Sequence, residues 1–254
     1  MTTGRVYQSV IEKERALKYN GACVQVVPHV PLEIVDRIKT AQKNAKADVT
    51  LVEIGGTVGE YENILFLEAA RMMKLADTRH VMFVMVSYLP TPSKIGEMKT
   101  KPTQHSVRTL NASGIQPDII LARSRGLLDA KRRQKISFFC NVPENHVISA
   151  PDIESIYEVP LIFAKEKLPE TIASILDLKL SRNHSVNAEK WKTLVRKIKT
   201  TKDEIKIAIV GKYFETGDFM LSDAYISVIE AIKFSTFALG KKPVLTWFSA
   251  SEFE

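Results

Sequence analysis

Short runs of β-branched and other apolar residues alternate with segments of helical periodicity along most of this chain. This alternation is typical of a parallel sheet whose strands are joined by crossover helices, so it predicts an α/β fold. The run 48–54 is almost continuously apolar, which indicates a central strand. Further strands are predicted at 23–27, 80–88, 118–122 and 146–149, with helices at about 31–46, 63–75 and 127–139.

The character of the sequence changes after residue 160. The Lys-rich run 197–202 is typical of a domain exit and linker. A new strand is predicted at 205–211, followed by a helix at 223–237 and a strand at 244–248. Because a strand–helix–strand unit of about 50 residues is smaller than most independent domains, we expect this second domain to be incomplete.

Composition excludes several classes of protein. An apolar share of 45% and a charged share of 26% suit a globular chain of 254 residues, enough for one large or two modest domains. The net charge of +7 favours anionic partners, but the basic residues form no nucleic-acid module with aromatic residues. No run approaches the roughly 18 apolar residues of a membrane span. The two cysteines are far apart, so we expect no disulfide scaffold and a cytoplasmic setting.

A carboxylate stands at the end of the strand predicted at 48–54. Glu53 precedes Gly55 and Gly56, and the carboxyl end of a central parallel strand is where such sheets bind ligands. Glycines there let a phosphate approach closely, and a carboxylate beside phosphates suits Mg²⁺. A tight turn with an incidental glutamate explains the same residues equally well, so both interpretations stay open.

Two lysines and two hydroxyl groups precede a predicted helix in the segment 96–106. Lys99 and Lys101 at a helix N-terminus predict an anion site, because free N–H groups and the helix dipole both favour negative charge there. Pro102 suits the first turn, since it needs no N–H partner. The alternative is a solvated basic loop in which Thr103 is simply the N-cap.

A basic run on the helix after the fourth predicted strand is a third candidate. Lys131 and Lys135 share one face of that helix, although a solvated face is the default interpretation. The chain has no G-x-x-x-x-G-K-[ST] loop, no nucleophile elbow and no histidines at metal-ligand spacing. Cys140 lies in an apolar stretch, which predicts a buried, inert thiol.

Several segments resemble the CTP synthase family. VEIGGTVG, GEMKTKPTQHSV, GIQPDII, KISFFCNVPE and VISAPDIESIYEVP occur in that family's order, and IAIVGKY with SDAYISVIEAIK resembles the start of its glutaminase domain. The resemblance implies a partial P-loop-type, dethiobiotin-synthetase-like amidoligase domain over 1–178, lacking its first βα units. It implies a linker at 179–204 and an incomplete flavodoxin-like class I glutaminase domain over 205–254.

The resemblance also implies roles for residues of this sequence. Glu53 would be a Mg²⁺ ligand beside the ATP phosphates. The remaining implied contacts are with UTP or CTP at Lys99, Thr100, Lys101, Pro102, Thr103, Gln104 and Lys135, with inhibitory CTP at Glu60, Tyr61 and Glu62, and with the ATP adenine at Pro151, Asp152 and Ile153.

The reaction implied by the resemblance is the ATP-dependent amination of UTP to CTP in pyrimidine biosynthesis. ATP would phosphorylate UTP O4, and ammonia from glutamine would then displace the phosphate. The family assembles as a homo-tetramer. Its members continue before and after the matched segments, so we expect a chain truncated at both ends that makes no CTP and hydrolyses no glutamine by itself.

Two other functions stay open at this point. One is a related amidoligase acting on a cofactor precursor, which would share the sheet and the carboxylate turn but lack KTKPTQ. The other is a non-catalytic regulatory or assembly subunit that keeps the pyrimidine nucleotide pocket. In-frame coding sequence for a phosphate loop upstream and a cysteine domain downstream would favour the enzyme.

Overall fold

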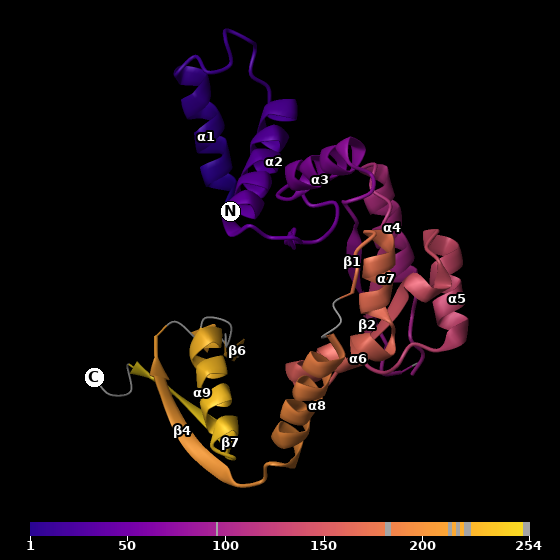
Figure 1. Ribbon diagram of the computed structural model, residues 1–254, viewed down its shortest axis with the longest axis vertical. Helices are drawn as coiled ribbons and strands as arrows, with labels where there is room; N and C mark the ends of the chain where they lie inside the picture. Colours follow the sequence, from indigo (N-terminus) through magenta and orange to yellow (C-terminus); the bar gives the residue numbers. More distant parts are fainter. Residues whose placement is uncertain (95, 181–183, 213–214, 217–218, 221–224, 251–254) are drawn as a thin grey trace. The chain divides into compact units, whose positions relative to one another are not determined.

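A computed structural model describes the chain except for residues 95, 181–183, 213–214, 217–218, 221–224 and 251–254 (Figure 1). The chain divides into two compact units, Met1–Leu180 and Ser181–Glu254. Within the described ranges, no helix combines the length and the apolar character that crossing a bilayer requires.

The larger unit is organised around a three-stranded parallel sheet in the order β1–β2–β3. Its strands are β1 (Val84–Leu89), β2 (Ile119–Ser124) and β3 (Val147–Pro151). These strands confirm the predictions at 80–88, 118–122 and 146–149. Leu89 pairs with Ser124, and Ser124 pairs with Pro151, so the three strands end level at one edge of the sheet.

Helices cover this sheet and extend beyond it (Figure 1). The helices of this unit are α1 (Thr3–Arg15), α2 (Val26–Ala45), α3 (Ile64–Ala76), α4 (Lys101–Ala112), α5 (Ala130–Cys140), α6 (Val159–Lys165) and α7 (Leu168–Ile175), with 3-10 turns η1 (Glu144–His146) and η2 (Ile156–Glu158). The predicted helices at 31–46, 63–75 and 127–139 correspond to α2, α3 and α5.

The core lies on both sides of β2, which is the middle strand. Ile120 packs in one cluster with Val107 of α4 and Ile136 of α5. Ile119 faces the opposite side and packs with Leu168 of α7. Neither isoleucine is accessible to solvent, so β2 is the doubly covered strand of this sheet.

A second cluster joins α1, α2 and α3. Val6 and Val10 of α1 pack against Val30 and Ile34 of α2 and Ala69 of α3. The apolar residues of α1 and α2 recur at helical spacing, which places them on facing stripes.

A buried ion-pair group reinforces this helical cluster. The Glu33 side chain is only 5% exposed, and its two oxygens accept hydrogen bonds from Lys13 at 2.5 Å and Arg37 at 2.7 Å. Burial by itself raises the pKa of Glu33, but the bonds from Lys13 and Arg37 outweigh it and hold the pKa below its ordinary value.

Two predicted strands are wrong. Residues 48–54 form no strand, and Leu51 is 94% exposed. A strand needs a neighbour to pair its backbone groups, and among the described residues none lies alongside 48–54. Residues 23–27 are not a strand either, because no strand among the described residues pairs with them. The backbone is extended at Val27 (φ −111°, ψ 125°), where α2 is kinked. The proline at 28, which has no N–H to donate, makes continued ladder pairing unfavourable there.

The smaller unit contains the second strand–helix–strand pattern. Its elements are α8 (His184–Thr200), β4 (Glu204–Gly211), β5 (Glu215–Thr216), β6 (Phe219–Met220), α9 (Ile226–Ala238) and β7 (Lys242–Ser249). Strands β4 and β7 pair in parallel, which confirms the strands predicted at 205–211 and 244–248. Helix α9 matches the predicted 223–237 helix, of which residues 223–224 lie outside the described residues.

Candidate functional site

The loops after β1, β2 and β3 leave the sheet at one edge, because the three strands end level. The segment 90–100 follows β1 and leads into α4, residues 125–129 connect β2 to α5, and residues 152–155 follow β3. Open parallel sheets bind ligands outside the carboxyl ends of their strands. The three predicted nucleotide-contact segments at 99–104, 135 and 151–153 therefore follow three neighbouring strands.

A group of cations surrounds Glu97 at this edge. Lys99 Nζ lies 2.7 Å from Glu97 Oε2, and Arg132 Nη2 lies 3.3 Å from Glu97 Oε1. The hydrogen bond from Lys99 and the charges of Lys99, Arg132 and Lys135 hold the pKa of Glu97 below its ordinary value. The fold thus brings Lys99, from the segment before α4, and Lys135, from α5, into one electrostatic group.

Arg132 fastens the two parts of this group together. Its Nε donates to the Met98 carbonyl at 3.0 Å, and its guanidinium also pairs with Asp129. Asp129 is the N-cap of α5 and accepts from the Arg132 backbone N–H at 2.9 Å. The start of α5 is therefore tied to the segment that carries Lys99.

The first turn of α4 is held by buried hydroxyl and amide groups. Thr103 is fully buried and hydrogen-bonds through its hydroxyl to Ser87 of β1 at 2.8 Å. Gln104 Nε2 donates to Thr100 Oγ1 at 3.1 Å. These contacts fix α4 against the sheet, while Lys99 is half-buried and Lys101 is exposed.

The first residue of α4 decides which threonine is its N-cap. The N-cap of α4 is Thr100, so the interpretation of Thr103 as the N-cap is wrong. Pro102 does lie in the first turn, as predicted. The sequence pattern alone could not separate two nearby hydroxyl residues, because Thr100 and Thr103 both precede helical residues.

The Glu53 carboxylate is exposed and lies at the start of an irregular turn. Asn63, the N-cap of α3, closes that turn by donating from Nδ2 to the carbonyls of Gly55 at 3.3 Å and Thr57 at 2.8 Å. Gly56 has a φ of +84°, which a side chain would rarely adopt, so its glycine is required by the backbone. Ile54 next to Glu53 packs against the same core cluster as Met98.

The donor groups of this turn decide whether it can hold Mg²⁺. Across the described residues, no three His, Cys, Asp or Glu side chains gather in a way that could hold a metal ion. A single exposed carboxylate still fits Mg²⁺, which is commonly held by one or two carboxylates together with phosphate oxygens. Glu53 could therefore hold Mg²⁺ jointly with phosphate oxygens of a ligand, but it does not form a metal site with other protein groups alone.

The other predicted contacts lie in two places. Glu60, Tyr61 and Glu62 are exposed, and Tyr61 and Glu62 line a 90 Å³ cavity with side chains of α1, α2 and α3. Asp152 Oδ1 forms an ion pair with Arg123 Nη2 at 3.5 Å. The backbone N–H of Asp152 donates to the Ser124 carbonyl at 2.8 Å. In the part of the chain that the structure describes, no hydrogen bond or ion pair joins residues 60–62 to the Glu97 group.

Known proteins match this chain along its whole length. Residues 1–178 match the family described as "CTP synthase N-terminus". The chain belongs to that family. It is 48% identical to the CTP synthase of Thermococcus kodakarensis and 44% identical to that of Nostoc punctiforme, in both cases over the whole chain. It spans only 46% and 45% of those relatives, so it covers about half the length of the curated proteins that it matches.

Sequence reasoning within the CTP synthase pattern missed Glu97, Arg132, Arg133 and Glu166. Arg133 Nη2 donates to Glu166 Oε2 at 2.7 Å, and the same oxygen accepts from Ser149 N at 3.0 Å. Ser149 Oγ in turn accepts from Leu128 N at 3.0 Å. This group anchors α5 to β3, so it positions Lys135. Glu97 lies inside the quoted GEMKTKPTQHSV segment, which was its only signal in the sequence.

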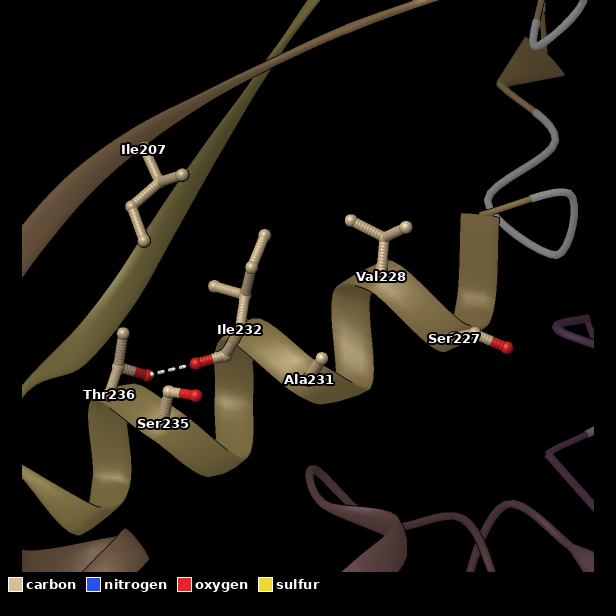
Figure 2. A pocket seen from close by; sticks show the side chains of 7 residues that line it. All are labelled: Ile207, Ser227, Val228, Ala231, Ile232, Ser235 and Thr236. Carbon is tan, nitrogen blue, oxygen red and sulfur yellow. Dashed lines mark hydrogen bonds between the residues drawn. The ribbon is translucent and has the colours of Figure 1, made fainter.

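A groove in the smaller unit has a different chemistry. It has a volume of 480 Å³ and is lined by Ile207, Ser227, Val228, Ala231, Ile232, Ser235 and Thr236. Figure 2 shows Ile207 extending from β4 toward α9, with Thr236 Oγ1 bonded to the Ile232 carbonyl. Because none of the described lining side chains is charged, this groove offers hydroxyl groups but no ammonium, guanidinium or carboxylate group to neutralise a phosphate or transfer a proton.

Alkylation should distinguish the two cysteines of the chain. Cys140 is buried and burial raises the pKa of its thiol to about 11, whereas Cys23 is exposed. At about pH 8 only about one Cys140 thiol in a thousand would be ionised even if reagent reached it. We expect iodoacetamide to modify Cys23 and spare Cys140, as measured by peptide mass spectrometry. Both should react in urea, and equal rates in the folded chain would contradict the inert-thiol interpretation.

Proposed function

We propose that this chain is the nucleotide-binding part of a CTP synthase, the ligase that aminates UTP to CTP with ATP and with ammonia from glutamine. The observation that carries the proposal is the meeting of Lys99 and Arg132 at the two oxygens of Glu97, at the carboxyl edge of the sheet. Lys135 follows Arg132 by about one turn of α5. Membership of the family over residues 1–178 supports the same conclusion.

The proposed binding mode assigns the triphosphate of UTP or CTP to Lys99, Lys101 and Lys135. Ammonium groups on two elements can neutralise several phosphate oxygens, and charge-assisted hydrogen bonds are among the strongest polar contacts. Thr100, Pro102, Thr103 and Gln104 shape the floor of this site, because the buried side chains hold the α4 N-terminus in place.

The ATP side of the site would lie around residues 151–153 and Glu53. Pro151, Asp152 and Ile153 follow β3 and would contact the adenine. Glu53 would hold Mg²⁺ jointly with ATP phosphates, and the ion, when bound, would neutralise phosphate charge. Glu60, Tyr61 and Glu62 would contact CTP bound as an inhibitor.

The chemical task of these residues is to bring two nucleotides together. Phosphorylation of UTP O4 by ATP needs the γ-phosphate of ATP to reach the uracil ring while both anionic nucleotides are held in one site. Lysines that neutralise the UTP triphosphate reduce the repulsion between the two nucleotides and hold UTP in position. The ammonia that displaces the new phosphate would come from glutamine.

The proposed architecture follows the same family. Residues 1–178 would form a P-loop-type, dethiobiotin-synthetase-like amidoligase domain. Residues 179–204 would connect it to the start of a flavodoxin-like class I glutaminase domain at 205–254. The enzyme would act in the cytoplasm in pyrimidine biosynthesis, as a homo-tetramer.

Calorimetric titration with UTP tests the proposal. Lys99→Ala and Lys101→Ala are each expected to weaken UTP binding by about 1.5–3 kcal/mol, or roughly 10- to 150-fold, since each removes a charge-assisted phosphate contact. Lys39→Ala is a matched control, because Lys39 is an exposed lysine on α2 in the same unit. Equal dissociation constants for the wild type and both site variants would discredit the assigned pocket.

A further inference from the structure

Glu97 presents each of its two oxygens to a different cation. Oε2 pairs with Lys99 at 2.7 Å and Oε1 pairs with Arg132 at 3.3 Å, and these cations come from different elements. Lys135 adds its positive charge to the same carboxylate. A carboxylate contacted in this way imitates the oxygens of a phosphate group, which the same donors would also bind.

The two cations differ in how firmly the chain holds them. Arg132 is anchored by the Met98 carbonyl and by Asp129, and its side chain is only 25% exposed. Among the described residues, the Lys99 ammonium pairs with Glu97 alone and so has no second anchor. Lys99 is therefore the cation that can change partner at the smallest cost.

The exposure of Glu97 makes such an exchange possible. Its side chain is 54% exposed, so solvent screens the Lys99–Glu97 pair and the pair is weak, as exposed ion pairs usually are. A triphosphate carries several negative charges and can outcompete one carboxylate for the same lysine. A weakly charged ligand has less to offset the lost pair.

We propose that Glu97 occupies a phosphate position in the free chain and that a polyphosphate group displaces it from Lys99. The inference rests on the proposed function for the identity of the nucleotide, but its geometry concerns only the phosphate. Glu97 is then a built-in competitor that keeps the lysine in place and favours highly charged ligands over weakly charged ones.

Removing the negative charge of Glu97 tests this inference. Glu97→Gln is expected to bind sodium tripolyphosphate and UTP roughly two- to fivefold more tightly than the wild type, because no competing carboxylate has to be displaced. The measurement is calorimetric titration of the full chain at fixed salt concentration. Glu170→Gln is the matched control, since Glu170 is an exposed glutamate of the same unit and its net charge change is identical.

A double-mutant cycle separates direct competition from a general change in charge. In a Lys99→Ala background, Glu97→Gln should lose most of its gain, because the displaced partner is gone. Equal gains from Glu97→Gln and Glu170→Gln, or unchanged or weaker tripolyphosphate binding in Glu97→Gln, would overturn the inference. Failure of tripolyphosphate to bind any variant would overturn it as well.

The two probes also separate this inference from the proposed function. Tripolyphosphate results as expected without UTP binding would leave the displacement standing and remove the assigned nucleotide. UTP binding that depends on Lys99 but is indifferent to Glu97 would leave the proposed function standing and remove the displacement.

Discussion

Ile120→Ala is expected to lower the free energy of unfolding of the unit Met1–Leu180 by about 4 kcal/mol. Ile120 is fully buried in β2, where it pairs with Met85 of β1 and Val147 of β3. Its side chain belongs to the cluster that α4 and α5 cover. Because neighbours on both strands and both helices fix the site, the cavity left by truncation cannot collapse fully.

Urea unfolding followed by circular dichroism measures this loss, and hydrogen exchange of the peptide containing 119–124 localises it. Ile156→Ala is the control, since Ile156 is 61% exposed and the same atoms are removed. We expect the control to change stability by less than about 0.5 kcal/mol. A loss at Ile120 no larger than that of the control would mean that β2 is not the covered middle strand.

Glu33→Ala is expected to cost about 1–3 kcal/mol at neutral pH, because it removes the buried carboxylate that accepts hydrogen bonds from both Lys13 and Arg37. Glu33→Gln should cost less, since an amide keeps part of the hydrogen bonding. Glu14→Ala is the control on α1, where Glu14 is exposed. Urea unfolding provides the measurement, and equal stability of the Glu33 and Glu14 variants would contradict the assignment.

The cost of losing Glu33 should depend on pH in a defined direction. The pKa of Glu33 in the folded chain lies below its ordinary value of 4.5. The stabilisation is therefore fully present above about pH 4.5 and is lost as the pH falls through the lower folded-state pKa. The difference between the wild type and Glu33→Gln should shrink toward acid pH. A difference that grows on acidification would mean that Glu33 is not held ionised by Lys13 and Arg37.

The two site predictions act in opposite directions on one pair of residues. Lys99→Ala should weaken UTP binding, while Glu97→Gln should strengthen it, although both changes break the same ion pair. A purely structural role for this pair would make both variants bind UTP less well. The opposite signs therefore distinguish a ligand-binding lysine with a competing carboxylate from an ordinary surface salt bridge.

The sequence by itself predicted the elements whose signal is local. The strands β1, β2, β3, β4 and β7 follow from dense apolar runs, and α2, α3, α5 and α9 follow from helical periodicity. The element signals need only neighbouring residues, because periodicity and turn chemistry are properties of short segments. Local pattern made Lys99 and Lys135 separate candidates, and only the family resemblance implied that they contact one nucleotide.

Only the tertiary structure decided which elements pair and which charges meet. The apolar run 48–54 has the composition of a buried strand. A strand also needs a neighbouring strand to pair with its backbone groups, and the local sequence does not identify that neighbour. The Glu97–Arg132 and Arg133–Glu166 pairs join residues 35 and 33 positions apart. Such contacts form because the crossover connections of a parallel sheet bring segments that are distant in sequence to the same edge. The spacing of residues along the chain does not reveal which of them will meet there.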